Sequence, residues 1–224
     1  MAFQPTLTTA LQPPPGPAAQ LVLPDSSSTL INPPVFNDAM IVRMHVFVDE
    51  QHCSADAEID ADDARSWQWV VYESSPPTSP RTPVAVIRLV PPPQPPHALL
   101  THPSNPASQT LPEFDWAHEP CIKLTRVAVR ADYRGRGLGR QLVETALVWA
   151  AEHSADIDEA TAQQAARTQW SGPSAQWRGL VLVHAQADVE QMYHGLGFTT
   201  DESLGRWEEE GIEHVGMFRR VKLR

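Results

Sequence analysis

The sequence predicts a mixed α/β fold, and three observations carry this prediction. Residues 122–129 are rich in β-branched side chains, alternate with a period of two, and lead through a glycine-rich loop into a helical pattern over residues 140–151. Residues 67–73 and 84–90 have the composition of two strands joined by a Pro/Ser/Thr turn, which predicts an antiparallel hairpin. Residues 179–185 are nearly all apolar, as is typical of a central strand, and we expect them to pair with residues 122–129.

Proline-rich stretches set the predicted domain boundaries. Residues 1–20 are predicted to form a flexible arm, and residues 21–224 are predicted to form the folded domain. Within that domain the first strand is expected at residues 21–23 or 30–31, or as two pieces over both. Residues 91–120 are so rich in proline that we expect an insertion without regular secondary structure.

The remaining elements follow from helical spacing and from helix breakers. Apolar residues recur at helical spacing over residues 35–47, directly after two prolines. Residues 154–177 are expected to extend the preceding helix or to add a short one. A short helix is predicted over residues 187–196, followed by a closing strand pair at residues 198–201 and 215–221.

Composition narrows the functional classes. The chain has 224 residues, 42% of them hydrophobic, which is enough for one sizeable core and predicts a single domain. Its formal net charge of -10 argues against nucleic-acid binding, and the absence of an 18-residue apolar run predicts no membrane association. The two cysteines do not form a disulfide framework, and the N-terminus does not resemble a secretory signal. We therefore expect a cytoplasmic protein, with the nucleus as an alternative.

Residues 134–139 carry the main functional motif, with glycine at every second position before the predicted helix. Such a loop lets several backbone N–H groups converge on one anion at the positive end of the helix. A P-loop is excluded because Gly139 is followed by Arg140 and Gln141, and the dinucleotide fingerprint is excluded because its third glycine would fall at Arg140. Asp132 is the one acidic residue in a basic segment, whose members are Lys123, Arg126, Arg130, Arg134, Arg136 and Arg140.

The spacing of Arg134, Gly137 and Gly139, after a strand and before a helix, resembles the GNAT superfamily of acyl-CoA-dependent N-acyltransferases. The resemblance implies a mixed central sheet of about 6–7 strands, with parallel, splayed strands 4 and 5 and flanking helices. It also implies acetyl-CoA as co-substrate, with the pantetheine along the strand and the pyrophosphate on the loop. The implied cofactor-binding residues are Thr125, Val127, Ala128, Val129, Arg134, Gly135, Arg136, Gly137, Leu138, Gly139 and Arg140.

Two further segments are similar to the ElaA-like branch of this superfamily. One runs from Arg43 through Glu50 and Gln51 to an acidic stretch that contains Asp60, and the other covers residues 210–217. In that branch the first segment lies beside the acceptor site. The implied acceptor-binding residues are Glu50, Gln51, Asp60, Trp67 and His214. Trp67 has core packing as its alternative role.

The resemblance also implies catalytic roles. Tyr193 stands four residues before Gly197-Phe198, and the tyrosine of the superfamily at this place protonates the leaving thiolate. Removal of the amine proton is expected from Glu50, Glu210 or His214, and the sequence does not rank them. Cys121 begins a strand and has no neighbouring base, so a cysteine nucleophile is not expected.

The sequence therefore predicts an acetyl-CoA-dependent N-acetyltransferase that acts on a primary amine of a small molecule by direct attack. An amino sugar, a polyamine and an amino-acid derivative remain open as acceptors. A protein or peptide N-acetyltransferase and a non-catalytic acyl-CoA-binding module are the alternatives. No metal site is expected, because the histidines of residues 91–120 are scattered, and the chain is expected to be a monomer or homodimer.

Overall fold

The computed structural model describes residues 6–24, 30–74, 80–101, 108–173 and 175–224. The chain divides into two compact units. Unit 1 comprises Met1–Val90 and Thr125–Ala146, and unit 2 comprises Pro91–Leu124 and Leu147–Arg224. Strand β4 (Ile122–Val129) and helix α3 (Leu138–Glu152) pass from one unit into the other. No helix of the described residues is both long and apolar enough to cross a bilayer.

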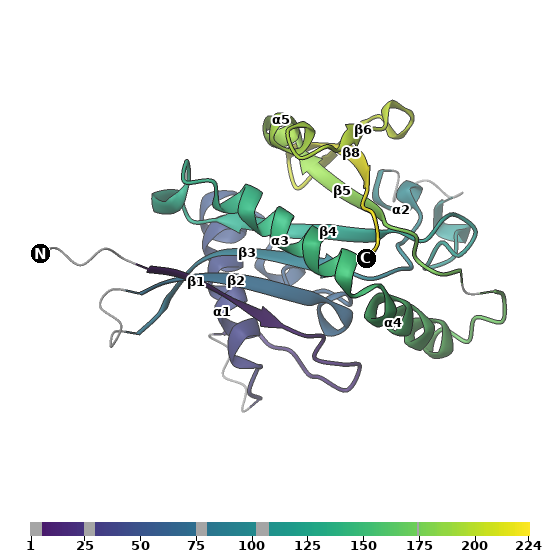
Figure 1. The fold of residues 1–224 in the computed structure, drawn as a ribbon, viewed down its shortest axis with the longest axis horizontal. Coiled ribbons are helices and arrows are strands. Elements are labelled where there is room, and N and C mark those ends of the chain that lie inside the picture. The colour runs from purple at the N-terminus through teal and green to yellow at the C-terminus, as the bar shows by residue number, and fades with distance from the viewer. Residues whose placement is uncertain (1–5, 25–29, 75–79, 102–107, 174) are drawn as a thin grey trace, which may run out of the picture. The chain divides into compact units, whose positions relative to one another are not determined.

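Unit 1 contains the strands β1 (Thr6–Gln12), β2 (Trp67–Ser74), β3 (Thr82–Val90) and most of β4, hydrogen-bonded in that order. β1 pairs with β2, and β2 with β3, both in antiparallel register, which confirms the predicted hairpin. Figure 1 shows β1, β2 and β3 side by side. The first strand of the described residues therefore lies at Thr6–Gln12 and not at residues 21–23 or 30–31, where it was expected, because the backbone of this segment pairs with β2 from Thr6–Ser74 to Gln12–Gln68.

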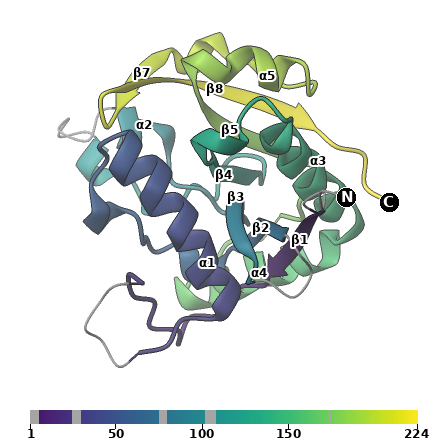
Figure 2. The same cartoon turned by 90° about the vertical axis from the view of Figure 1, so that its left-hand side faces the viewer.

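Helix α1 (Pro34–Arg43) covers one face of these strands, as Figure 2 shows, and a π-helical segment (Met44–Glu50) continues it. The first half of α3 lies on the opposite face. Proline at the first helical position suits α1, because its missing N–H would have no partner there. The core between α1 and the strands consists of Ala39, Val42, Val46, Val70, Tyr72, Val86 and Ala128.

Unit 2 is built on the start of β4 with β5 (Leu180–Gln186), β8 (Ile212–Arg220) and β6 (Thr199–Thr200), in that order. β4 and β5 pair in parallel through three residue pairs, from Ile122–Val181 to Leu124–Val183, so this ladder ends at Leu124. β8 runs antiparallel to β5, and β7 (Arg206–Glu209) also pairs with β8. The predicted mixed sheet with parallel fourth and fifth strands is confirmed, and the described residues contribute eight strands to it.

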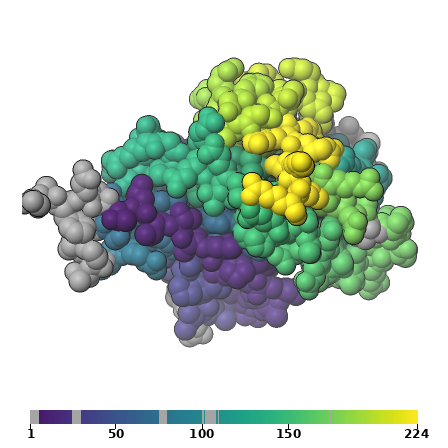
Figure 3. Space-filling model, viewed as in Figure 1, coloured from purple at the N-terminus to yellow at the C-terminus, as the bar shows by residue number. Residues whose placement is uncertain are grey.

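The helices of unit 2 are α2 (His97–Thr101), α4 (Ser154–Arg167) and α5 (Glu190–His194). Helix α2 corrects the expectation that residues 91–120 contain no regular structure. Its five residues include no proline and follow two prolines, which favour a helix start. At the C-terminus the Arg224 N–H donates to the Ala151 carbonyl at 2.9 Å. Figure 3 shows the yellow C-terminal residues lying against green ones.

Candidate functional site

The glycine-rich loop of unit 1 is exposed and leads directly into the 15-residue helix α3. Gly135 and Gly137 have φ angles of +75° and +79°, in the left-handed region that favours glycine. Among the described residues, a Cβ added at either position would meet no heavy atom within 4 Å. The first helical hydrogen bond after the loop runs from the Gln141 N–H to the Gly137 carbonyl, so the N–H groups of Gly135 to Gly139 precede the hydrogen-bond ladder of α3, where anions bind to helices.

Each loop arginine is balanced by a carboxylate in unit 1. Arg134 pairs with Glu50 and donates from Nε to the Val129 carbonyl at 2.9 Å. The guanidinium of Arg136 lies 4.0 Å from Glu73 and over the Tyr133 ring. Arg140 pairs with Glu144 at 3.1 Å, one helical turn further on. The side chains of the three arginines are about half exposed (49%, 53% and 51%), so a phosphate can compete for them.

Glu50, predicted to take part in acceptor binding and catalysis, therefore lies against the glycine-rich loop. It ends the π-helical segment Met44–Glu50, where one carboxylate oxygen contacts Arg134 and the other lies 3.4 Å from His45 Nε2. π-helical turns often occur at functional sites. Gln51 follows as the cap of this segment, and its N–H donates to the Val46 carbonyl.

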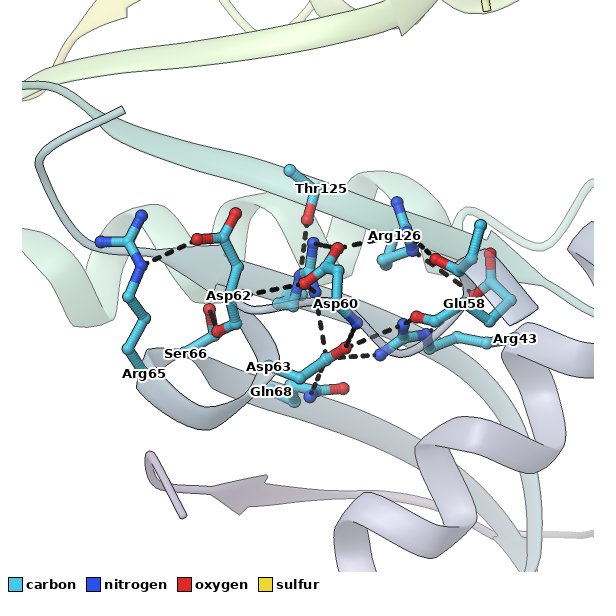
Figure 4. A network of polar contacts seen from close by, with 12 residues as sticks. Arg43, Glu58, Asp60, Asp62, Asp63, Arg65, Ser66, Gln68, Thr125 and Arg126 are labelled. Atoms are coloured by element: carbon cyan, nitrogen blue, oxygen red, sulfur yellow. Dashed lines mark hydrogen bonds and ion pairs between the residues drawn. The ribbon is translucent and has the colours of Figure 1, made fainter. Parts of the chain in front are cut away.

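A buried polar network lies beside β4, as Figure 4 shows. Arg88 donates to both carboxylate oxygens of Asp60 at 2.6 and 2.8 Å, and to the Thr125 hydroxyl at 2.9 Å. Burial alone would raise the pKa of Asp60, but the guanidinium of Arg88 holds that pKa well below its usual range. Both carboxylate oxygens of Asp60 thus already accept hydrogen bonds from Arg88. The attraction of an amine by Asp60, which the sequence predicted, would have to act through the part of this carboxylate that is exposed to solvent.

Arg126 joins this network by a local break in β4. Its φ angle is +51°, and its guanidinium lies 3.3 Å from Asp60 and 3.4 Å from Glu58. Thr125, the preceding residue, contacts the same network through Arg88. Side chains of a regular strand alternate between faces, so two consecutive residues on one side indicate a bulge. The predicted alternation of residues 122–129 is therefore interrupted at Arg126.

Trp67, the predicted acceptor residue on β2, is 6% exposed and lies among the buried side chains of unit 1. Its neighbour on the same face, Trp69, is 4% exposed. These values agree with the alternative reading of core packing that the sequence left open.

The candidates of unit 2 lie on three different elements. Tyr193 is on α5, 4% exposed, with its ring edge against Phe198, and burial raises the pKa of its hydroxyl. Glu210 is exposed in the two-residue turn between β7 and β8. His214 on β8 donates from Nδ1 to the Ile212 carbonyl at 2.8 Å and stacks on Trp207. Burial raises the pKa of the Cys121 thiol to about 12, which disfavours it as a nucleophile.

Sequence reasoning missed a cavity of about 580 Å³ in unit 2. Its walls come from residues 92–98, the start of β4 and the strand β5, and they include Lys123 and His184. A histidine in the otherwise apolar run 180–185 is the one feature of the sequence that points to this place. Among the described residues, no group of three His, Cys, Asp or Glu side chains is arranged to hold a metal ion.

Comparisons with known proteins agree with this geometry. The model of the acetyltransferase (GNAT) family matches residues 42–168. The structure is similar to an acyl-CoA N-acyltransferase from Pseudomonas aeruginosa (22% identity, 96% of this chain and 99% of that one, TM-score 0.51). It is also similar to Escherichia coli ElaA (19%, 96% and 100%, TM-score 0.50) and to Arabidopsis thaliana NAA60 in complex with acetyl-CoA (13%, 96% and 99%, TM-score 0.51).

Proposed function

Because the chain belongs to the acetyltransferase (GNAT) family, we propose that it transfers an acetyl group from acetyl-CoA to a primary amine of a small molecule. The observation that carries this proposal is the exposed loop 134–139, with two left-handed glycines and three half-exposed arginines at the start of α3. This combination of glycine-rich backbone amides, helix dipole and guanidinium charge suits a diphosphate. CoA carries such a diphosphate next to its pantetheine arm.

The second half of β4 is the proposed binding site of the pantetheine arm. Its parallel ladder with β5 ends at Leu124, and the remaining residues Thr125–Val129 continue toward the loop. In the proposed complex, backbone groups of this segment pair with the pantetheine amides as an added strand would. An N–H near Val127 polarises the thioester carbonyl and stabilises the oxyanion of the tetrahedral intermediate.

In the proposed reaction the amine nitrogen forms a bond to the acetyl carbon, and the carbon–sulfur bond breaks. The nitrogen loses a proton to a base, and the CoA thiolate gains a proton from Tyr193. Replacing Tyr193 by Phe removes this proton donor and keeps the ring contact with Phe198. We expect turnover to fall by about 10²-fold or more with acetyl-CoA affinity unchanged. Normal turnover in this variant would remove Tyr193 from the mechanism.

Glu50, Glu210 and His214 remain the candidate bases, and their surroundings suggest how to separate them. Glu50 contacts Arg134 of the loop, so Glu50→Gln is expected to change acetyl-CoA affinity as well as turnover. Glu210 lies in an exposed turn, so Glu210→Gln is expected to leave that affinity unchanged. The base is the residue whose variant loses turnover at saturating acetyl-CoA and regains part of it at higher pH.

The function is tested by calorimetric titration with acetyl-CoA and by detection of released thiol across a panel of amines. The panel contains glucosamine, spermidine, apolar amino acids and peptides. Acetyl-CoA binding with thiol release on a small amine supports the proposal. Release on peptides alone would identify a peptide acetyltransferase, and binding without any release would identify a non-catalytic acyl-CoA-binding module.

A further inference from the structure

The backbone of β4 is bent at Arg126, directly before Val127. The φ angle of Arg126 is +51°, in the left-handed region that is unfavourable for residues with a Cβ atom. Among the described strands, Arg126 is the only residue with a positive φ. A backbone conformation of this kind persists only where the surrounding structure holds it, and it is common at functional sites. The contacts of Arg126 and of its neighbours therefore matter for the function of β4.

Asp60 links two arginines that hold this bend. Its Oδ2 accepts from Arg88 Nη2 at 2.8 Å and from Arg126 Nη2 at 3.3 Å, and its Oδ1 accepts from Arg88 Nη1 at 2.6 Å. Arg88 also donates from Nε to the Thr125 hydroxyl at 2.9 Å, so it contacts the residue that precedes the bend. Figure 4 shows Thr125 and Arg126 of β4 reaching into this network. Both residues are thus connected to Asp60, one directly and one through Arg88.

The other contacts of the Arg126 guanidinium come from the same loop. Its Nη2 donates to the Ala57 carbonyl at 3.3 Å, and its Nε lies 3.4 Å from Glu58 Oε2. Glu58 is shared with Arg43, whose Nε lies closer to the same oxygen, at 3.1 Å. Among the described carboxylates of this network, Asp60 is the one that contacts the arginines of both β3 and β4. Asp60 therefore connects the bend of β4 to the neighbouring strand.

The direction of the Val127 N–H follows from the pairing of β4 with β3. The Arg130 N–H donates to the Val84 carbonyl of β3 at 3.0 Å, and the backbone of Arg130 is extended. Along a strand the backbone polar groups of successive residues point to opposite edges, so the Val127 N–H, three residues earlier, points away from β3. In unit 1, β4 is the last strand of the order β1-β2-β3-β4, and its ladder with β5 ends at Leu124. Among the described strands, none pairs with Val127 at this edge.

We propose that Asp60 is a positioning residue, which holds the bend of β4 through Arg88 and Arg126 and thereby directs the Val127 N–H at the thioester carbonyl of acetyl-CoA. This inference rests on the proposed N-acyltransferase function and gives Asp60 a role other than the attraction of the amine. A donor to a developing oxyanion is effective when it is held in place before the charge forms. Without its contacts, the left-handed residue would relax and turn this N–H away.

Infrared difference spectroscopy of the full chain with acetyl-CoA, labelled with ¹³C at the carbonyl carbon, reports on this N–H directly. A hydrogen bond weakens the C=O bond, so the bound carbonyl of the wild type should absorb at lower frequency than that of free acetyl-CoA. In Asp60→Asn this shift is expected to shrink, because the charge that holds both guanidinium groups is lost. Asp56→Asn is the matched control, since Asp56 is exposed in the same acidic stretch, and it should keep the full shift.

Two substitutions of Arg126 separate the backbone conformation from the charge. Arg126→Ala and Arg126→Gly both remove the guanidinium, but only glycine adopts a positive φ without strain. Arg126→Ala is therefore expected to lose more of the carbonyl shift than Arg126→Gly. In the Arg126→Gly background, Asp60→Asn should have a smaller further effect than it has in the wild type. Equal shifts in the alanine and glycine variants overturn the proposed role of the bend.

Thiol release gives the kinetic counterpart, measured with the best acceptor among glucosamine, spermidine, apolar amino acids and peptides. Asp60→Asn is expected to lower kcat by about 10–10²-fold, with the KM of the amine unchanged. A raised amine KM with an unchanged carbonyl shift would make Asp60 an acceptor-binding residue and overturn the inference.

Failure of this inference can be told apart from failure of the proposed function. A wild-type protein that binds acetyl-CoA and releases thiol, with the same carbonyl frequency in Asp60→Asn, overturns the inference and supports the function. Absence of acetyl-CoA binding to the wild type overturns the function and, with it, the role of Asp60.

Discussion

Asp63 gives a quantitative test of the buried network that supports β4. Its side chain is fully buried, and its Oδ1 lies 2.7 Å from Arg43 and 3.0 Å from Arg88. The same carboxylate accepts from Gln68 Nε2 at 3.1 Å and from the Asp60 N–H at 3.0 Å. Asp63→Asn keeps the size of the side chain but removes the charge that faces two buried guanidinium groups, and it turns an NH₂ group toward existing donors.

Breaking a buried ion pair by removing one partner costs about 3–5 kcal/mol. At about 2–4 °C per kcal/mol for a chain of this size, the melting temperature should fall by roughly 6–20 °C. The assay is urea and thermal unfolding followed by tryptophan fluorescence. Asp62→Asn is the control, because Asp62 pairs with Arg65 in a partly exposed position and surface pairs contribute about 0–1 kcal/mol. Equal destabilisation by the two substitutions would refute this reasoning.

Two further predictions concern stability. Gly179→Ala is expected to lower the free energy of unfolding by about 3 kcal/mol or more, because φ is +88° and the new Cβ would overlap the Val221 carbonyl. The control is Gly211→Ala, which has a φ of +77° but no described heavy atom near the new Cβ, and should cost about 1–2 kcal/mol. Similar urea midpoints for the two variants would contradict the overlap. Arg88 holds the folded pKa of Asp60 below its unfolded value, so the stabilisation by this carboxylate is complete above the unfolded pKa of about 3.9 and is lost as the pH falls. The stability difference between the wild type and Asp60→Asn should therefore shrink from about pH 6 to about pH 3, and a constant difference would contradict the assignment.

The elements near the glycine-rich loop could be predicted because their information is local. Residues 122–129 form β4 with the predicted bounds, since period-two alternation and β-branched side chains are contained in the segment itself. The three glycines at alternate positions likewise indicated the turn before α3. By contrast, Thr6–Gln12 was assigned to a flexible arm because prolines dominate its surroundings, and only its pairing with β2 makes it a strand.

Other features depend on contacts between distant residues and were not accessible to sequence reasoning. The charge of the loop arginines is offset by Glu50 and Glu73, which lie far before them in the chain. The strand β7 has the sequence Arg-Trp-Glu-Glu, which lacks the alternating apolar residues of a typical strand. It forms a strand because it pairs with β8. The cavity of unit 2 is lined by a proline-rich insertion together with Lys123 and His184. The local sequence pattern does not indicate that these distant segments lie side by side.

A crystal structure of the protein with acetyl-CoA is the most direct test of the central claim about residues 134–140. The account predicts diphosphate oxygens within hydrogen-bonding distance of backbone N–H groups between Gly135 and Arg140, with Arg134 or Arg136 turned from its carboxylate partner toward the phosphates. A CoA molecule whose diphosphate lies elsewhere, with these amides still facing water, would contradict it.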